Sequence, residues 1–297
     1  MSTMNRQTTS EKIAHVINYI LLVLLGLSII VPMLSVVGSS FVSAAEIARR
    51  GEFILIPQEW DLTSYKMVFR SANVWSGFRN SLFLVVVGTL SSMVCTVCMA
   101  YPLSKKKLRG RNGILLMVFF TMIFNAGTVP NYILIANVLH MLDTRWVLFV
   151  PYLVNTWNML LMRNFFYSVP DALEEAALLD GANQAQILIH VVLPLSMASL
   201  VTIAMFYGVS YWNAWWPGVI YLNANKYKPI QNIIRSIIDA ANAAQSDLGF
   251  EGDVMTPPPT HSLKCATIVV GTVPILVVYP FIQKYFVKGV MVGSVKG

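Results

Sequence analysis

Six long apolar stretches are the feature that most limits what this chain can fold into. A helix needs about 20 predominantly apolar residues to cross the hydrocarbon core of a bilayer. The apolar cores of the stretches contain no Asp, Glu, Lys or Arg. One such charge at mid-bilayer costs roughly 2.5–3.5 kcal/mol, whereas each Leu or Ile contributes about 0.3–0.6 kcal/mol. We therefore predict an all-α membrane protein, a single transmembrane domain over residues 1–297 with about six helices, with spans near 13–37, 80–102, 114–137, 146–166, 195–222 and 264–287.

The composition agrees with a membrane protein and excludes other classes. Hydrophobic residues make up 56% of the chain and charged residues 12%, whereas a soluble domain carries about 25% charged residues. The formal net charge is +7, but a nucleic-acid-binding protein gathers its basic residues on one folded face. Here they lie between the apolar stretches. We expect membrane lipid, and no nucleic acid, as a partner.

The basic residues predict the orientation in the membrane. Six spans place both termini on the same side. Segment 105–111 carries five Lys and Arg in seven residues, and short loops of this kind near helix ends stay in the cytoplasm. Both termini are therefore predicted to be cytoplasmic, with outer segments at 38–79 and 223–263. Three stiff prolines at 257–259 indicate that the second is an ordered lip or a loop that touches a partner, and a plain solvated connector is the alternative. The first apolar stretch is longer than the 7–15 residues of a signal-peptide core, so we expect a retained anchor helix.

The sequence lacks the residues that would make this chain a pump or an enzyme by itself. Ion-coupled carriers usually keep ionisable residues inside their spans, and this chain has none there. No Gly-x4-Gly-Lys-Ser/Thr phosphate loop occurs, and the four His residues show no metal-ligand spacing. We predict a non-enzyme without catalytic residues, a metal site or a cofactor of its own, driven by another subunit. A self-contained ion-coupled secondary carrier is the alternative, and a membrane-embedded enzyme is disfavoured.

The most informative segment is 168–194, SVPDALEEAALLDGANQAQILIHVVLP, between the fourth and fifth predicted spans. Ser168 is followed by a proline and an acid, the residue types that begin a capped helix. Gly181 ends that helix, and Asn183 with Gln186 predicts a second cap. We therefore expect a short helix, a glycine turn and a second short helix that ends before the final proline of the segment.

The acids of the first short helix favour docking on a partner protein. Glu174 and Glu175 are able to pair with basic groups of a partner, and Ala176 and Ala177 allow its backbone to approach closely. The alternative is an amphipathic helix lying on the membrane. Such helices usually carry Lys and Arg, and the anionic inner leaflet would repel an acidic one. A docking element is therefore the preferred interpretation.

The segment also has a recognisable spacing. Glu175-Ala176-Ala177 is followed after three residues by Gly181, and after nine more by Val191-x-Leu193-Pro194. This resembles the EAA loop of bacterial ATP-binding-cassette (ABC) import permeases, EAA-x3-G-x9-I-x-LP, with valine for isoleucine as the one departure. We call residues 168–194 the EAA loop. The resemblance implies a coupling helix that contacts a cytoplasmic ATPase, through the coupling residues Asp171, Glu174, Glu175, Ala176, Ala177, Asp180, Gly181 and Pro194.

The resemblance extends over nearly the whole chain. It is to the six-helix, maltose-type half of carbohydrate importers, and within them to the branch for complex or acidic oligosaccharides such as alginate and pectin fragments. It implies a heterodimeric permease in the bacterial cytoplasmic (inner) membrane. The implied partners are a second permease subunit, a dimeric ATPase carrying ATP and Mg, an extracytoplasmic solute-binding protein and an oligosaccharide. The tail, residues 284–297, is expected to reach between the ATPase subunits on an extended path, which its glycines allow. The matching segments are 124–135, 162–166, 211–213 and 285–289.

The fifth span is rich in aromatic and amide residues. Small-molecule sites combine apolar walls with a few polar groups, but Trp and Tyr near the end of a span are also ordinary interface residues. In maltose-type relatives the other permease subunit makes the main sugar contacts, which counts against a solute path here. A solute-path role and an interface role both stay open. The candidates for a solute path are Tyr207, Tyr211, Asn213, Asn125, Asn155 and Asn158.

Overall fold

The computed structural model describes residues 9–247 and 260–294, and every ordered element among them is a helix. The three prolines at 257–259 lie outside the described residues. The chain forms two compact units, one of residues 1–71 with 236–271 and the other of residues 72–235 with 272–297. Each unit is described by itself. The all-α prediction agrees with these elements.

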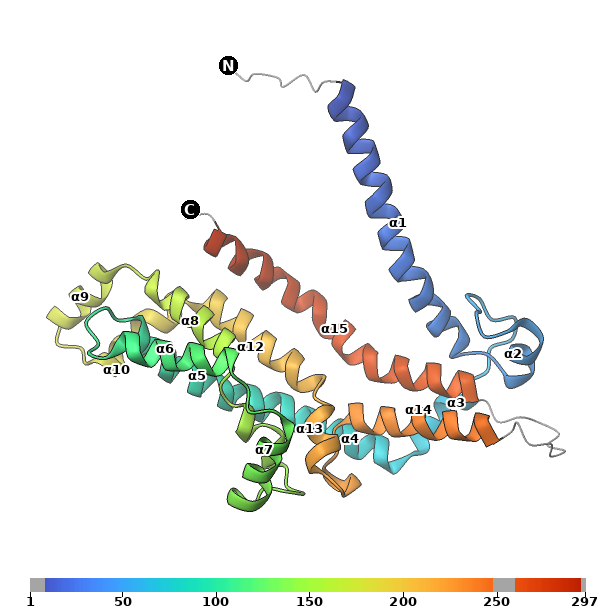
Figure 1. Cartoon of the computed structure of the whole chain (residues 1–297). Helices are drawn as coiled ribbons and strands as arrows, with labels where there is room; N and C mark the ends of the chain where they lie inside the picture. The colour runs from blue at the N-terminus through green and yellow to red at the C-terminus, as the bar shows by residue number, and fades with distance from the viewer. Residues whose placement is uncertain (1–8, 248–259, 295–297) are drawn as a thin grey trace. The chain divides into compact units, whose positions relative to one another are not determined.

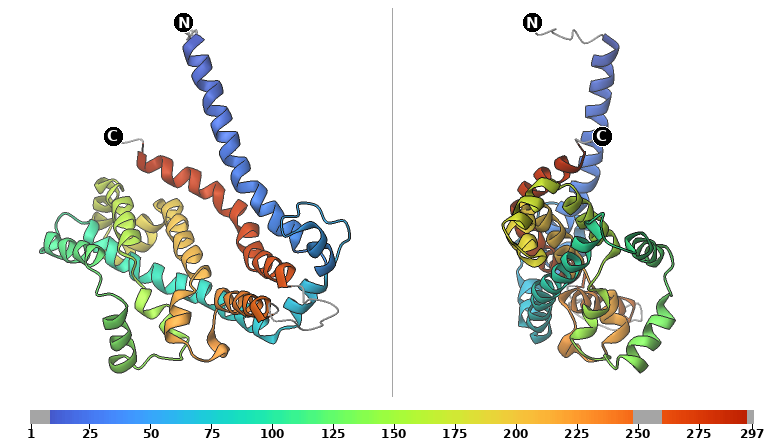
Figure 2. Two further views of the ribbon diagram at one scale, coloured as in Figure 1. Left: turned by 45° about the vertical axis from the view of Figure 1, so that its right-hand side comes forward. Right: turned by 90° about the vertical axis from the view of Figure 1, so that its left-hand side faces the viewer.

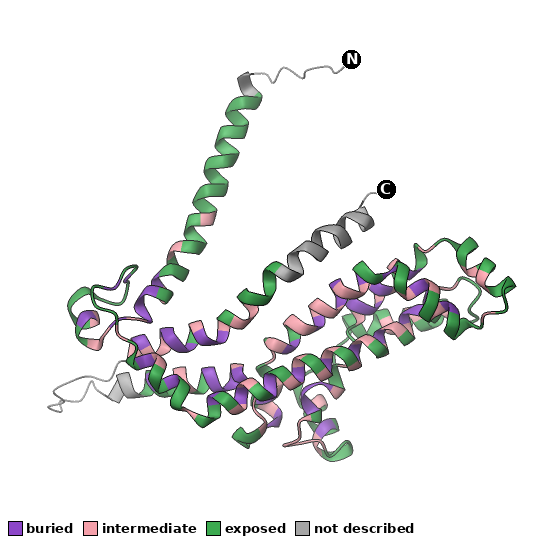
Figure 3. Cartoon of the chain, turned by 180° about the vertical axis from the view of Figure 1, so that it is seen from behind, coloured by how far each residue is buried: buried purple, intermediate pink, exposed green. Residues whose placement is uncertain are grey.

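The first unit begins with α1 (Thr9–Ser39), a helix of 31 residues. Its side chains are exposed along most of its length (Figure 3), as expected of a helix that meets lipid or another subunit. At its end, Gly38 allows the chain to pass close to segment 53–55, because a Cβ there would lie 2.4 Å from the carbonyl oxygen of Ile54. Two short helices follow, α2 (Ala44–Arg50) and α3 (Thr63–Arg70).

A buried carboxylate organises the segment after α1. Glu46, on α2, accepts hydrogen bonds from the backbone N–H groups of Gln58 at 3.0 Å and Glu59 at 3.5 Å, and forms an ion pair with Arg50. The Gln58 N–H and the Arg50 guanidinium hold the pKa of this carboxyl below its ordinary value, because both favour the charged form. The predicted outer segment 38–79 is therefore a folded structure. Ser262 on α15 (Thr260–Ser294) closes the unit by donating to the carbonyl of Val42 at 2.6 Å.

The second unit is built on a long helical span. It consists of α4 (Ala72–Phe83), a π-helical turn η1 (Leu84–Gly88) and α5 (Thr89–Ser104). Figures 1 and 2 show α5 beside α8 (Thr156–Tyr167) and α12 (Met197–Trp212), and these three helices contact one another. Their facing side chains form the core of the unit. Its fully buried members include Leu84, Met159, Met162, Phe166 and Ile203.

The predicted span 114–137 is bent. The helix α6 (Arg111–Ile123) and the helix formed by α7 (Thr128–Ile133) and η2 (Leu134–Val138) meet at 109°. The break contains Gly127, whose φ of +85° is a left-handed conformation that glycine adopts at little cost. Asn125 stabilises the break by accepting the Gly127 N–H at 2.8 Å.

The predicted span 146–166 is not one continuous helix. It contains two single turns, η3 (Trp146–Leu148) and η4 (Val150–Tyr152), before α8 begins. The side chain of Asn155 starts α8 by accepting the Asn158 N–H at 3.0 Å, as N-cap residues do. With 12 residues, α8 is about 18 Å long at 1.5 Å per residue, shorter than a bilayer core of about 30 Å.

The chain then runs through the EAA loop into α12, α13 (Trp216–Tyr221), η6 (Asn225–Tyr227) and α14 (Ile230–Asp247). Asp143 joins two loops of this unit: it accepts the backbone N–H groups of Ala224 at 3.1 Å and Asn223 at 2.6 Å. These N–H groups lower the pKa of the Asp143 carboxyl. Loops 139–145 and 221–224 are therefore held together.

Three described helices are long and apolar enough to cross a membrane, Glu11–Ser39, Ala72–Ser104 and Thr260–Pro280, or up to five if each bent pair is one span. The second bent pair is Gln184–Leu195 with Met197–Trp212, at 85°. The tail was expected to be extended, and this is wrong for residues 284–294, which continue α15. Gly289 and Gly293 cost a helix only about 1 kcal/mol each relative to alanine, so they do not end it.

Candidate functional site

The EAA loop forms two short helices separated by a glycine turn, as predicted. The first is α9 (Asp171–Leu179) and the second begins with α10 (Gln184–Ile187). Gly181 lies between them with a φ of +84°. Asn183 and Gln186 cap α10 reciprocally: the Asn183 side chain accepts the Gln186 N–H at 2.9 Å, and the Gln186 side chain accepts the Asn183 N–H at 2.8 Å. This is the capping box that the sequence indicated.

Two details of the loop differ from the prediction. Ser168 does not cap α9; its hydroxyl donates to the carbonyl of Phe165 at 2.7 Å and so belongs to the end of α8, while Pro170 occupies the N-cap position of α9. The second helix does not end before Pro194. It continues through a π-helical turn, η5 (Leu188–Val192), and α11 (Leu193–Leu195). The π turn ends two residues before Pro194, which has no N–H for the regular helical bond.

The acids of the loop have different environments. Glu174 forms an ion pair with Lys105, the residue that follows α5, and its side chain is 12% exposed. Asp171, Glu175 and Asp180 are exposed. The loop therefore presents Glu175 to a partner, whereas Glu174 is already paired inside the chain. Sequence analysis singled out segment 105–111 only for its charge. It could not predict this ion pair, because the two residues are 69 positions apart in the sequence.

The small residues of the motif lie on two sides of α9. Ala176 is exposed, and Ala177 is partly buried against the core of the second unit. Leu179, at the last turn of α9, is 89% exposed. An exposed surface of small, apolar and acidic residues is therefore available for contact with another protein.

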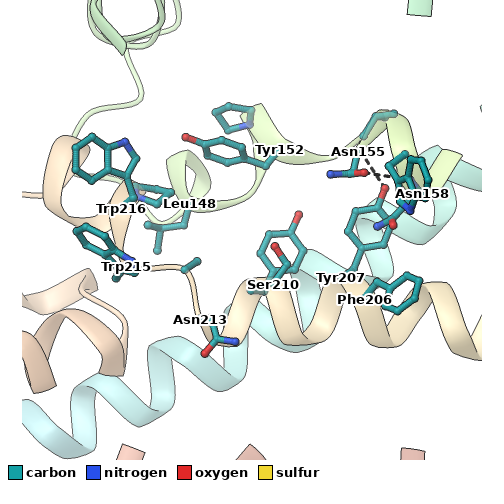
Figure 4. A pocket seen from close by; sticks show the side chains of 16 residues that line it. Leu148, Tyr152, Asn155, Asn158, Phe206, Tyr207, Ser210, Asn213, Trp215 and Trp216 are labelled. Carbon is teal, nitrogen blue, oxygen red and sulfur yellow. Dashed lines mark hydrogen bonds between the residues drawn. The ribbon is translucent and has the colours of Figure 1, made fainter. Parts of the chain in front are cut away.

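A cavity of about 820 Å³ lies in the second unit, between the segment 148–158 and the end of α12 (Figure 4). Five of the six solute-path candidates line it, namely Tyr207, Tyr211, Asn213, Asn155 and Asn158. The sixth, Asn125, lies instead in the break between α6 and α7. The cavity is lined by apolar, aromatic, hydroxyl and amide groups, and none of its lining residues is Asp, Glu, Lys or Arg.

The two tyrosines of α12 use their hydroxyl groups to join helices. The Tyr207 hydroxyl shares a hydrogen bond with Thr96 of α5 at 2.7 Å and accepts the Asn155 N–H at 3.0 Å. The Tyr211 hydroxyl shares one with Ser92, also at 2.7 Å. Both side chains are less than 5% exposed. They therefore form a fixed wall of the cavity, and their hydroxyl groups are already bonded.

Asn158 provides an amide on the wall of the cavity. No described residue forms a hydrogen bond with the side-chain amide of Asn158, which is 6% exposed. Tyr152 and Ser210 also line the cavity (Figure 4), and sequence reasoning missed them. The break in the fourth span at Pro151 and Asn155 was the available signal, because an interrupted helix leaves room beside it.

No group of three or more His, Cys, Asp or Glu side chains in the described part of the chain is arranged to hold a metal ion. Apolar helices, a capped loop between two of them and a neutral cavity together define a membrane transport subunit. Residues 81–292 match the family described as binding-protein-dependent transport system inner membrane component. The chain belongs to this family, and it is a permease subunit of an ABC importer.

Several characterised proteins are similar along nearly their whole length. The polygalacturonan/rhamnogalacturonan transport system permease protein YtcP of Bacillus subtilis is 39% identical over 94% of this chain and 96% of its own. Protein LplC of the same organism is 37% identical over 98% and 97%. A chain in the crystal structure of a bacterial ABC transporter involved in the import of the acidic polysaccharide alginate has a TM-score of 0.84 and 31% identity, over 94% of this chain and 99% of that one.

Proposed function

We propose that this permease imports an oligosaccharide, and that ATP hydrolysis on a separate subunit drives it through the EAA loop. The observation that carries the proposal is the shape of that loop. Its nine-residue α9 and capped α10 meet at Gly181, and Glu175 is exposed on α9. A short helix with an exposed acid fits a docking contact with basic groups of a cytoplasmic ATPase, because charge-assisted hydrogen bonds are short and strong.

The proposed assembly follows from what this chain lacks and from its family. It has no phosphate-binding sequence, so ATP and Mg would be bound by a dimeric ATPase. A second permease subunit would complete the membrane path as a heterodimer. An extracytoplasmic binding protein would deliver the solute to the outer segments 38–79 and 223–263. The density of basic residues at 105–111 supports an inner membrane orientation with both termini in the cytoplasm.

The cavity is the proposed solute path. Amides donate and accept hydrogen bonds, and aromatic rings provide apolar walls; both suit the hydroxyl groups and ring faces of a sugar. The name of one relative refers to polygalacturonan and rhamnogalacturonan, and the similar solved structure is of a transporter involved in the import of the acidic polysaccharide alginate. Because no lining residue of the cavity carries a charge, we propose that the acidic groups of such a solute are recognised by the partners or at the ends of the path.

Charge reversal of the exposed acid tests the coupling proposal. In the complex purified through a tag on this chain, Glu175→Lys should lower solute-stimulated ATP hydrolysis at least about tenfold, the scale of a coupling energy of 1–3 kcal/mol between sites. The reason is that a cation would face the basic groups of the ATPase. The measurements are ATP hydrolysis with the loaded binding protein, and the amount of this chain in the membrane, which should not change.

Glu59→Lys is the matched control, because Glu59 is an exposed acid of the predicted outer segment. Glu175→Lys is expected to lower the amount of ATPase that co-purifies, and Glu59→Lys should leave that amount unchanged. Full stimulation of ATP hydrolysis in Glu175→Lys would contradict docking at α9. Uptake into vesicles that is driven by an ion gradient without the ATPase would instead support the carrier alternative.

A further inference from the structure

The end of α5 binds the first helix of the EAA loop. Lys105 follows the last turn of α5, and its ammonium group contacts both carboxylate oxygens of Glu174 on α9. The same ammonium group lies 4.4 Å from the centre of the Tyr101 ring. The side chains of Lys105 and Glu174 are only 25% and 12% exposed. An ion pair shielded in this way is screened less by salt than a pair on an open surface.

The same turn of α5 binds the second helix of the loop. The Tyr101 hydroxyl donates to the side-chain oxygen of Gln184, the first residue of α10, at 3.1 Å. The Tyr101 ring packs edge-to-face on Phe166 of α8, with 6.2 Å between ring centres. We call Tyr101, Lys105, Glu174 and Gln184 the Lys105 cluster. It joins both helices of the EAA loop to one turn of one membrane helix.

Other contacts of α9 are few. None of its residues is fully buried, and it packs chiefly against α10, its neighbour in the sequence. Figure 1 shows α9 and α10 at one end of the second unit, beside the labels of α5 and α6. A helix of nine residues with so little packing has little stability of its own. The Lys105 cluster is therefore the main link that fixes α9 to the membrane helices.

The middle of α5 contacts the wall of the cavity. Thr96 and Ser92 form 2.7 Å hydrogen bonds with Tyr207 and Tyr211, which line the cavity. From Thr89 to Ser104 α5 is one helix, with Pro102, which has no N–H, in its last turn; the regular backbone bonds from Ser92 and Thr96 as far as Tyr101 make this part stiff along its axis. A contiguous series of contacts thus runs from the EAA loop through α5 to the cavity, and packed side chains, hydrogen bonds and helices of this kind are able to carry energetic coupling between distant sites.

We propose that Lys105 and Tyr101 are positioning residues that hold the EAA loop on α5, so that α5 transmits the movement of the loop to the cavity. This rests on the proposed function of the loop. Lys105 acts through Glu174, and it does not itself bind the ATPase. The same contacts make Glu174 a part of the transmission path, and they leave Glu175 as the acid that faces the partner.

A charge exchange tests the proposal in the complete transport complex. Lys105→Glu and Glu174→Lys should each lower solute-stimulated ATP hydrolysis about tenfold, because like charges would then separate α9 from α5. The double variant restores an opposite pair and should recover stimulation to within about threefold of the unchanged complex, as a double-mutant cycle between contacting residues predicts. Tyr101→Phe, which removes only the hydroxyl bonded to Gln184, should give a smaller loss.

Two further measurements separate positioning from docking and from folding. The amount of ATPase that co-purifies should be unchanged in all these variants, and Lys107→Glu, an exposed lysine of the same segment, should behave like the unchanged complex. Three results would each overturn the proposal. The single variants would behave like Lys107→Glu, the double variant would fail to recover stimulation, or the single variants would lose bound ATPase. Failure of the proposed function is a separate result: the unchanged complex would then show no stimulation, or Glu175→Lys no effect.

Discussion

Asn158 is the residue whose environment says most about the cavity. Its amide is nearly buried, lines the cavity, and forms no side-chain hydrogen bond with any described residue. The described side-chain atoms that are buried without a hydrogen-bond partner belong to Asn80, Thr89, Arg145 and Asn232, so the Asn158 amide is not sealed inside the fold but faces the cavity. Tyr207 and Tyr211 are in the opposite situation, since their hydroxyl groups are bonded to α5. A solute that bonds to the Asn158 amide would satisfy a group that the fold leaves open.

Replacement of this amide by an apolar side chain of similar size distinguishes a binding role from a packing role. Asn158→Leu should preserve the apparent Tm, because the amide faces the cavity and forms no side-chain hydrogen bond with a described residue. It should also increase about tenfold the solute concentration needed for half-maximal ATP hydrolysis, the effect of losing one hydrogen bond of about 1.4 kcal/mol. Asn137→Leu, at an exposed position outside the cavity, should change neither quantity. A lower Tm with an unchanged solute response would contradict the binding role.

Single residues also show what the sequence allowed us to predict in the EAA loop. Gly181 and the Asn183–Gln186 capping box act on their immediate neighbours, and the structure confirms both. Ser168 was misassigned because a serine between two helices is able to end the first or begin the second. The ion pair of Lys105 and Glu174 could not be predicted, because charge patterns say nothing of which distant residues come together.

At the scale of elements, hydropathy located the spans but not their breaks. The stretches around α1 and α15 and most of the long span 72–104 were recognised because they are predominantly apolar; residues 72–79, which contain Arg79, were assigned to the outer segment 38–79 instead. The bend at Gly127 and the short α8 were not, since apolar composition is the same in a straight helix and in an interrupted one. Pro151 and Asn155 carried the missing information, one by lacking an N–H and the other by capping a new helix.

The packing of α12 against α5 and the π turn that precedes α5 depends on a glycine. A Cβ at Gly88 would lie 3.0–3.1 Å from atoms of the Tyr211 ring, and that ring is fixed by its bond to Ser92. Gly88→Ala should therefore destabilise the protein by about 1–3 kcal/mol, the usual cost of overpacking. The apparent Tm in detergent measures this effect.

Gly113→Ala in α6 is the control for this variant, since a Cβ there meets nothing within 4 Å. In a helix interior alanine is favoured over glycine by roughly 0.5–1 kcal/mol, so the apparent Tm should stay the same or rise. Equal decreases in the two variants would show that the packing of α5 on α12 is not the reason for the glycine.

At the scale of the whole molecule, different parts of the chain perform three tasks. The apolar helices keep the chain in the membrane, the cavity of the second unit provides neutral polar groups, and the EAA loop provides an exposed contact surface joined to α5. The family membership assigns the chain to ABC importers. The central claim that remains is that the surface of α9 is where the ATPase binds, on the cytoplasmic side of the membrane.

Photo-crosslinking from Leu179 tests this claim most directly. Leu179 is 89% exposed on α9, and Trp60, in the predicted outer segment, is 72% exposed. A photoreactive residue at each position would be activated in the intact complex, and the captured protein identified by its mass. Leu179 is expected to capture the ATPase, with a yield that changes when nucleotide binds, and Trp60 is expected to capture none of it. Capture of the ATPase from Trp60, or none from Leu179 in a complex that contains the ATPase, would contradict the account.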